Sequence, residues 1–126
     1  MTDLDLHKNE TGIWTLKLCR PSQLNALSDD MVHHLHQMLE DVHQSTTCRV
    51  LILTGEGRGF CAGFDLGLAD DAPGSENGET AAWMRRQEKF AAIITQLKSL
   101  PQPVIAAVNG PANGAGFGLA LASSMR

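Results

Sequence analysis

The chain has 126 residues, of which 43% are hydrophobic and 19% charged, a balance typical of one globular domain. A net charge of −4 provides no basic surface, so binding to nucleic acid or to an anionic membrane is not expected. No apolar run is long enough to span a bilayer, and residues 1–5 lack the apolar segment of a signal peptide. Three cysteines without a CxxC pair suit free thiols, so a cytoplasmic location is expected.

Two alternating segments near the N-terminus predict a β-hairpin. Residues 4–7 and 13–19 alternate between apolar and polar side chains, and the segment between them, residues 9–12, is rich in turn formers. One face of the second segment carries Trp14, Leu16 and Leu18. Pro21 cannot donate to a β-ladder, so it is expected to end this strand.

Two long helices are predicted in the middle of the sequence. Ser28 suits an N-cap, and the two aspartates after it favour the start of a helix. The apolar stripe of this helix comprises Met31, Val32, Leu35, Met38, Leu39 and Val42. The second helix is expected over about residues 80–99, stopped by Pro101 and Pro103. Its expected inner face comprises Trp83, Phe90, Ile94 and Leu97.

Continuous apolar runs predict two strands of a parallel sheet. Residues 50–53 and 104–108 are apolar throughout, which fits strands that are buried on both faces. Residues 118–125 are predicted to form the first turns of a third helix, and residues 70–79 form a polar loop with small side chains. The order of elements is an α/β alternation, with no linker that would divide it.

The residues suited to chemistry lie in two glycine-rich segments, 57–66 and 109–118. Each follows a predicted strand, and ligands bind at the carboxyl ends of strands in open α/β sheets. Small residues let a ligand approach the backbone, and N–H groups at a helix start attract negative charge. Two such segments that face each other can donate hydrogen bonds to one oxygen, as an oxyanion hole does. The alternative is that they serve tight turns and close helix packing.

Three segments together resemble the crotonase family, which comprises enoyl-CoA hydratases and isomerases. They are residues 59–66, residues 104–122, and Arg20-Pro21 followed by Asn25-Ala26-Leu27, which resembles the family's early CoA-contact turn. The resemblance covers nearly the whole chain. It implies an α/β fold with the crotonase-like ββα spiral core, in which mostly parallel buried strands alternate with helices.

The resemblance also implies roles for individual residues. The backbone N–H groups of Phe64 and Ala115 match the family's oxyanion hole, which holds the enolate of an acyl-CoA thioester. The residues on or beside the CoA-binding turns are Leu24, Ala26, Ala62, Gly63, Asp65 and Leu66. Coenzyme A is part of the substrate, so no separate cofactor is expected. The acyl chain would pass residues 66–79, and Phe64 and Phe117 either line its pocket or pack beneath a loop.

Two departures from the family pattern bear on the reaction. Gly118 stands where family hydratases carry a catalytic glutamate, and this favours isomerisation over hydration, the lyase reaction. Within the chain, Asp65 matches a motif residue with a structural role, and Asp70 and Asp71 lie in the polar loop. Family members also continue well beyond this point. Residues 1–126 are therefore expected to be the N-terminal part of a single acyl-CoA-binding domain, truncated before the C-terminal helical region and inactive alone.

The family implies a homotrimer or a hexamer for the full-length protein, and a role in fatty acid metabolism. A different class is a non-catalytic crotonase-like module that binds acyl-CoA or assembles with partners, and Gly118 keeps this reading open. A dinucleotide site is disfavoured because the G-x-G-x-x-G fingerprint requires glycine where Leu119 stands. Cys61 as a nucleophile has no histidine partner nearby in the sequence. His33 and His36 have no clear third metal ligand.

Overall fold

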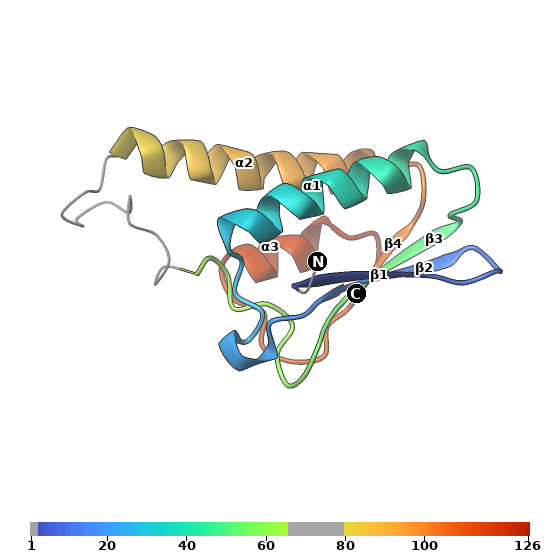
Figure 1. The fold of residues 1–126 in the computed structure, drawn as a ribbon, viewed down its shortest axis with the longest axis horizontal. Coiled ribbons are helices and arrows are strands. Elements are labelled where there is room, and N and C mark those ends of the chain that lie inside the picture. The colour runs from blue at the N-terminus through green and yellow to red at the C-terminus, as the bar shows by residue number, and fades with distance from the viewer. Residues whose placement is uncertain (1–2, 66–79) are drawn as a thin grey trace.

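The computed structural model of the protein describes residues 3–65 and 80–126 (Figure 1). Its strands are β1 (Leu4–Lys8), β2 (Ile13–Leu18), β3 (Val50–Gly55) and β4 (Val104–Ala107). Its helices are η1 (Pro21–Gln23, one 3-10 turn), α1 (Asp29–Gln44), α2 (Thr80–Ser99) and α3 (Ala115–Ala122). The predicted α/β alternation is therefore confirmed.

The strands form one sheet in the order β1-β2-β3-β4. β1 and β2 pair antiparallel, as the predicted hairpin requires, with Leu6 opposite Leu16. β2, β3 and β4 run parallel, and Leu16, Leu53 and Ala106 lie in register across them. The carboxyl ends of β3 and β4 therefore meet at one edge of the sheet, which brings together the segments that follow them.

The three α-helices lie on one side of this sheet (Figure 1). α1 begins where predicted, because the Ser28 hydroxyl accepts a hydrogen bond from the Met31 N–H at 3.2 Å. The buried residues of α1 are Met31, Val32, Leu35, Leu39 and Val42. α2 has the predicted bounds and buries Phe90, Ile93 and Leu97. Ile93 was not on the predicted inner face, and its burial follows because α2 packs against both α1 and α3.

The second face of the parallel strands is less covered than the sequence suggested. Leu51 and Leu53, which face the helices, are buried. Ile52 and Ile105, which face the other side of the sheet, are half-buried. The physical reason is that α1, α2 and α3 share the opposite side of the sheet (Figure 1). β4 also ends one residue earlier than expected, and Val108 is 44% exposed.

The third helix differs from its predicted bounds, residues 118–125. It begins earlier, at Ala115, and ends at Ala122. The chain then returns to β4, where the N–H of Ser124 donates to the Val104 carbonyl at 2.8 Å. Pairing with this free edge of the sheet replaces the last helical turn. Among the described helices, none combines the length and apolar character that crossing a membrane requires.

Substitution of Leu53 tests how much the buried residues of the sheet contribute to the free energy of unfolding. Its side chain is 1% exposed at the centre of β3. Leu53→Ala removes buried methyl groups and leaves a cavity, so it is expected to lower the free energy of unfolding by about 2–5 kcal/mol. The control is Met84→Ala on α2, where the side chain is 57% exposed and a change within about 0.5 kcal/mol is expected. Urea unfolding followed by circular dichroism measures both, and equal losses would contradict this account.

Candidate active site

The two glycine-rich segments pair side by side beyond the ends of β3 and β4. Cys61 and Ala112 form a parallel bridge, and Asn113 N donates to the Cys61 carbonyl at 3.0 Å. The approach is close because Gly116 has no side chain. A Cβ atom there would overlap the carbonyl oxygen of Cys61 and lie 2.7 Å from its Cβ. The segments thus face each other, because the strands that they follow, β3 and β4, are adjacent and parallel.

The N–H group of Phe64 points away from the chain with which its own segment pairs. Leu27 N donates to the Gly63 carbonyl at 2.7 Å, and Asp65 N donates to the Leu27 carbonyl at 2.9 Å. The N–H and C=O of a trans peptide point in opposite directions, so the Phe64 N–H is directed away from Leu27. Cys61, three residues earlier, bonds the second segment through both its N–H and its carbonyl. Among the described residues, this N–H has no hydrogen-bond acceptor.

Ala115 supplies another N–H group beside this edge, because it is the first residue of α3. The first N–H groups of a helix have no partner within it. Gly116 N donates to the Asn113 carbonyl at 2.8 Å, whereas the Ala115 N–H has no acceptor in the described part of the chain. A Cβ atom on Gly63 would lie 3.6 Å from Ala115 N, so the first segment abuts the start of α3. Two such donors on adjacent segments can hold an oxygen that becomes negative.

The residues assigned to CoA binding lie around this pairing, except Leu66, which is outside the described residues together with Asp70 and Asp71. Ala62 N donates to the Leu24 carbonyl at 3.0 Å, which joins the early turn to the first glycine-rich segment. The backbone conformation of this turn was not predicted. Leu24 and Asn25 have φ of 51° and 60°, a left-handed conformation that side chains seldom adopt.

Two asparagines hold these loops in place. Asn25 is fully buried, and its Nδ2 donates to the Gly59 carbonyl at 2.9 Å. Asn109 Nδ2 donates to the same carbonyl at 3.1 Å. Their Oδ1 atoms accept from the backbone N–H groups of Arg20 and Gly55, at 2.8 and 3.1 Å. Sequence reasoning missed both roles, and the only signal was an asparagine within a turn, where its side chain often bonds the backbone.

Asp65 is engaged in an ion pair. Its Oδ2 atom lies 2.8 Å from Arg20 Nη2, and Arg20 Nη1 donates to the Ala26 carbonyl at 2.6 Å. The side chains of Arg20 and Asp65 are 13% and 16% exposed. The contact is in keeping with the structural role that the family resemblance implied for this aspartate.

The ring of Phe64 packs against the beginning and middle of α2. It meets Trp83 and Phe90 edge to face, with ring centroids 6.3 and 5.3 Å apart. Such contacts between aromatic rings are favourable, and they hold the side chain of Phe64 in place beside its own backbone N–H. For Phe117 too, the sequence left open whether the ring lines the acyl pocket or packs beneath a loop. Its side chain is 55% exposed.

Gly118 faces an apolar surface. It lies one helical turn after Ala115 on α3, and a Cβ atom there would lie 3.7 Å from Ile94 Cδ1 and 3.8 Å from Phe90 Cε2. Both distances are ordinary van der Waals contacts. A carboxylate at this position would therefore start against hydrocarbon, where the charged form is disfavoured.

The thiol of Cys61 is unsuited to act as a nucleophile in this conformation. The residue is 0% exposed, and burial raises the pKa of the thiol to about 11. The thiolate is the nucleophilic form of cysteine, so this thiol is unreactive near neutral pH. The contribution of Cys61 to the site is its backbone, which bonds the second glycine-rich segment.

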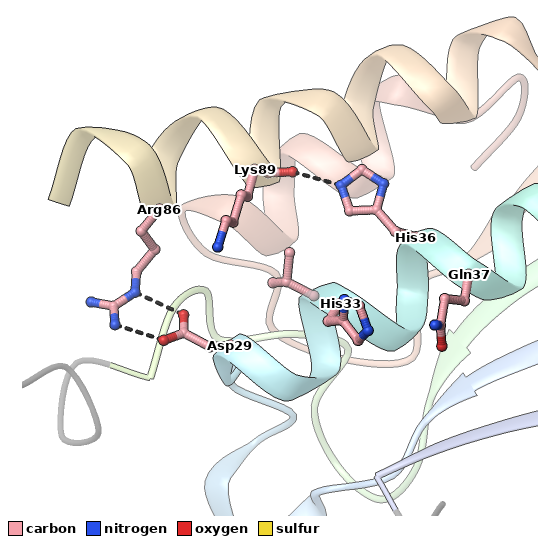
Figure 2. Close-up of a pocket in the computed structure, with 7 residues that line it drawn as sticks. Asp29, His33, His36, Gln37, Arg86 and Lys89 are labelled. Carbon is pink, nitrogen blue, oxygen red and sulfur yellow. Dashed lines mark hydrogen bonds and ion pairs between the residues drawn. The ribbon is translucent and has the colours of Figure 1, made fainter. Parts of the chain in front are cut away.

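A separate cavity of about 250 Å³ lies between α1 and α2 (Figure 2). It is lined by Asp29, Val32, His33, His36, Gln37, Arg86 and Lys89. Arg86 donates to both carboxylate oxygens of Asp29, at 2.8 and 2.7 Å. None of the lining residues belongs to the glycine-rich segments. Across residues 3–65 and 80–126, no group of three His, Cys, Asp or Glu side chains is placed to hold a metal ion.

Comparison with known proteins defines the family. The family model described as enoyl-CoA hydratase/isomerase matches residues 8–126. The chain is 41% identical over 121 residues to 1,2-epoxyphenylacetyl-CoA isomerase of Escherichia coli K12, covering 96% of this chain and 45% of that protein. It is 39% identical over 124 residues to a probable enoyl-CoA hydratase of Mycobacterium leprae, covering 98% and 42%. Its fold matches the crystal structure of an enoyl-CoA hydratase from Bacillus anthracis with a TM-score of 0.87 and 30% identity, covering 97% and 45%.

The chain therefore belongs to the enoyl-CoA hydratase/isomerase family, the crotonase family, as its motifs suggested. Its α/β fold is the corresponding part of the crotonase fold. The chain spans about 45% of the length of these relatives. Both an isomerase and a hydratase are among them by name, so family membership alone leaves the reaction type open.

Gly116 and Gly118 form a matched pair for testing the close approach of the two segments. Gly116→Ala would drive a Cβ atom into Cys61, so a loss of about 1–3 kcal/mol in unfolding free energy is expected. Gly118→Ala meets α2 at ordinary contact distance and favours the helix, so stability should rise by up to about 1 kcal/mol. Urea unfolding measures both variants. Equal effects of the two substitutions would show that the segments are not constrained as described.

Cysteine alkylation tests the burial of the first segment. At pH 8, Cys61 is expected to react with iodoacetamide far more slowly than the partly exposed Cys19, because its thiolate is scarce and enclosed. The rate at Cys61 should rise with pH up to about 11, the pKa of its thiol. Mass spectrometry of tryptic peptides gives both rates in one sample. Faster modification of Cys61 than of Cys19 would contradict the structure.

Proposed function

We propose that this chain is the N-terminal part of a single acyl-CoA-binding domain, in an enzyme that acts on acyl-CoA thioesters through an enolate. The observation that carries the proposal is that two backbone N–H groups on abutting segments, those of Phe64 and Ala115, have no acceptor in residues 3–65 and 80–126. In the proposed enzyme they form the oxyanion hole. Membership of the enoyl-CoA hydratase/isomerase family supports this assignment.

The chemistry follows from where charge develops. Removal of a proton from the carbon next to the thioester carbonyl moves an electron pair onto the carbonyl oxygen. The two N–H donors hold that oxygen more strongly as it becomes negative, and a single donor of this kind is worth about 10²–10³ in rate. The catalytic base is proposed to lie outside residues 1–126, because no carboxylate of this chain matches a catalytic acid of the family, and Asp65 is paired with Arg20.

Isomerisation is the favoured reaction. Position 118, the family's glutamate position in hydratases, is a glycine that faces Ile94 and Phe90. Hydration needs an acid and a base around a water molecule, whereas isomerisation needs one base that removes a proton and returns it elsewhere. The described side-chain atoms within 4 Å of a Cβ at this position are both hydrocarbon, so neither could activate water. The similarity to 1,2-epoxyphenylacetyl-CoA isomerase adds support.

The CoA portion is proposed to bind along Leu24, Ala26, Ala62, Gly63, Asp65 and Leu66. Coenzyme A is part of the substrate, and the proposed enzyme needs no separate cofactor. The full-length protein would act in fatty acid metabolism in the cytoplasm as a homotrimer or hexamer, with the C-terminal helical region completing the site.

A second candidate is a non-catalytic acyl-CoA-binding or assembly module of the same fold. The observation that favours it is Gly118, because an inactive relative needs no acid or base at that position. Such a module would keep the two N–H donors and bind thioesters without turning them over.

Titration of the full-length protein, and of this chain, with crotonyl-CoA tests the proposal. The matched ligand is butyl-CoA, a thioether that keeps coenzyme A and lacks the carbonyl oxygen. Crotonyl-CoA is expected to bind on the order of tenfold more tightly, because two hydrogen bonds are lost with the oxygen. NAD is the negative control and should not bind.

Each outcome of this calorimetric titration has a distinct meaning. Equal affinity for the thioester and the thioether would remove the oxyanion hole from the proposal. Thioester binding without conversion of enoyl-CoA by the full-length protein would favour the non-catalytic module. Binding of NAD instead would assign the second glycine-rich segment to a dinucleotide.

A further inference from the structure

Arg20 joins two parts of the candidate site with one guanidinium group. Its Nη1 donates to the Ala26 carbonyl at 2.6 Å, and its Nη2 donates to Asp65 Oδ2 at 2.8 Å. The first contact is on the residue before Leu27, and the second is on the residue after Phe64. A planar guanidinium is suited to this task, because its donors have a fixed geometry.

These contacts flank the pairing that orients the Phe64 N–H. Leu27 and Phe64 are partners in an isolated β-bridge, made by Leu27 N to the Gly63 carbonyl and Asp65 N to the Leu27 carbonyl. An isolated bridge has no continuing ladder to resist tilting of its peptides. Because a hydrogen bond weakens steeply as its angle departs from linear, a tilt of this peptide would weaken the bond from Phe64 to an oxygen.

Asp65 adds an electrostatic reason for the same contact. Asp65 directly follows Phe64, whose N–H is proposed to donate to an oxygen that becomes negative. An unpaired carboxylate there would oppose that charge, and the ion pair with Arg20 offsets it. Both side chains are mostly buried, so solvent and salt screen the pair less than a surface pair.

We propose that Arg20 is a positioning residue of the oxyanion hole. It sets the direction of the Phe64 N–H by holding Ala26 and Asp65 together, and it neutralises the Asp65 carboxylate. This inference rests on the proposed function, because it requires a thioester oxygen at the Phe64 and Ala115 donors. Loss of Arg20 should therefore change the polarisation of the bound carbonyl as well as stability.

The test uses the full-length protein with crotonyl-CoA labelled isotopically at its carbonyl carbon. Difference infrared spectroscopy records the carbonyl band, which should move to lower frequency on binding to the unmodified protein. In Arg20→Gln the shift should shrink, with kcat on enoyl-CoA falling by about 10-fold to 100-fold and KM changing by less than about threefold. Arg20→Lys should be intermediate, because an ammonium lacks the planar fork.

Arg86→Gln is the matched control. The Arg86 side chain is likewise 13% exposed and pairs with an aspartate, Asp29, whose side chain is 66% exposed, and this pair joins α1 to α2 (Figure 2). The Arg86→Gln substitution should lower the urea midpoint of unfolding while leaving the carbonyl band shift and kcat unchanged. Asp65→Asn keeps an oxygen acceptor for Arg20, so it should retain most of the shift. If Arg20→Gln does not fold, Arg20→Lys and Asp65→Asn supply the comparison.

The outcomes separate this inference from the proposed function. No band shift in the unmodified protein would overturn the proposed oxyanion hole itself. A shift there that persists undiminished in Arg20→Gln and Arg20→Lys would overturn only the positioning role. Equal losses of shift in Arg20→Gln and Arg86→Gln would also overturn it, since the loss of any arginine–aspartate pair would then have the same effect.

Discussion

The close pairing of residues 57–65 with residues 109–116 is the constraint on which the rest of this structure depends. A Cβ atom on Gly110 or Gly116 would overlap a carbonyl oxygen, of Arg58 or Cys61 respectively. The backbones approach this closely because β3 and β4 are adjacent and parallel, so both segments leave the sheet at one edge. The helices and the sheet core therefore serve the site by fixing the register of two strands.

Beyond the sheet, side-chain amides supplement the backbone pairing of the two segments. The segments that leave β3 and β4 carry backbone groups that need partners, as any partly buried backbone does. Asn25 and Asn109 supply them, and both donate to the Gly59 carbonyl. Peptide geometry within this network leaves the N–H groups of Phe64 and Ala115 directed elsewhere. These two N–H groups have no acceptor among the described residues because the polar groups around them already bond to one another.

The sequence predicted what depends on local periodicity. The alternation around Leu16, the cap at Ser28 and the stop before Pro101 each gave an element close to its observed bounds. The left-handed conformation at Leu24 was not predicted, because leucine disfavours it. Its N–H donates to the carbonyl of the first residue of η1, and its carbonyl accepts from Ala62, which is distant in the sequence. For the same reason the site was located by resemblance: a backbone N–H belongs to almost every residue, and its direction depends on tertiary pairing.

The packing around Gly118 limits which side chains, and therefore which reactions, this position could support. The position is one turn after Ala115, so a side chain there would lie near the oxygen that we propose the Ala115 N–H binds. Ile94 and Phe90 already line this place, and Phe90 also contacts the ring of Phe64. In the proposed oxyanion hole, hydrocarbon beside the two N–H groups would exclude water from one side and strengthen their interaction with a developing charge, since the local dielectric is low. The same surroundings disfavour an ionised acid, so an apolar α2 face and a glycine at 118 are mutually consistent features of one site.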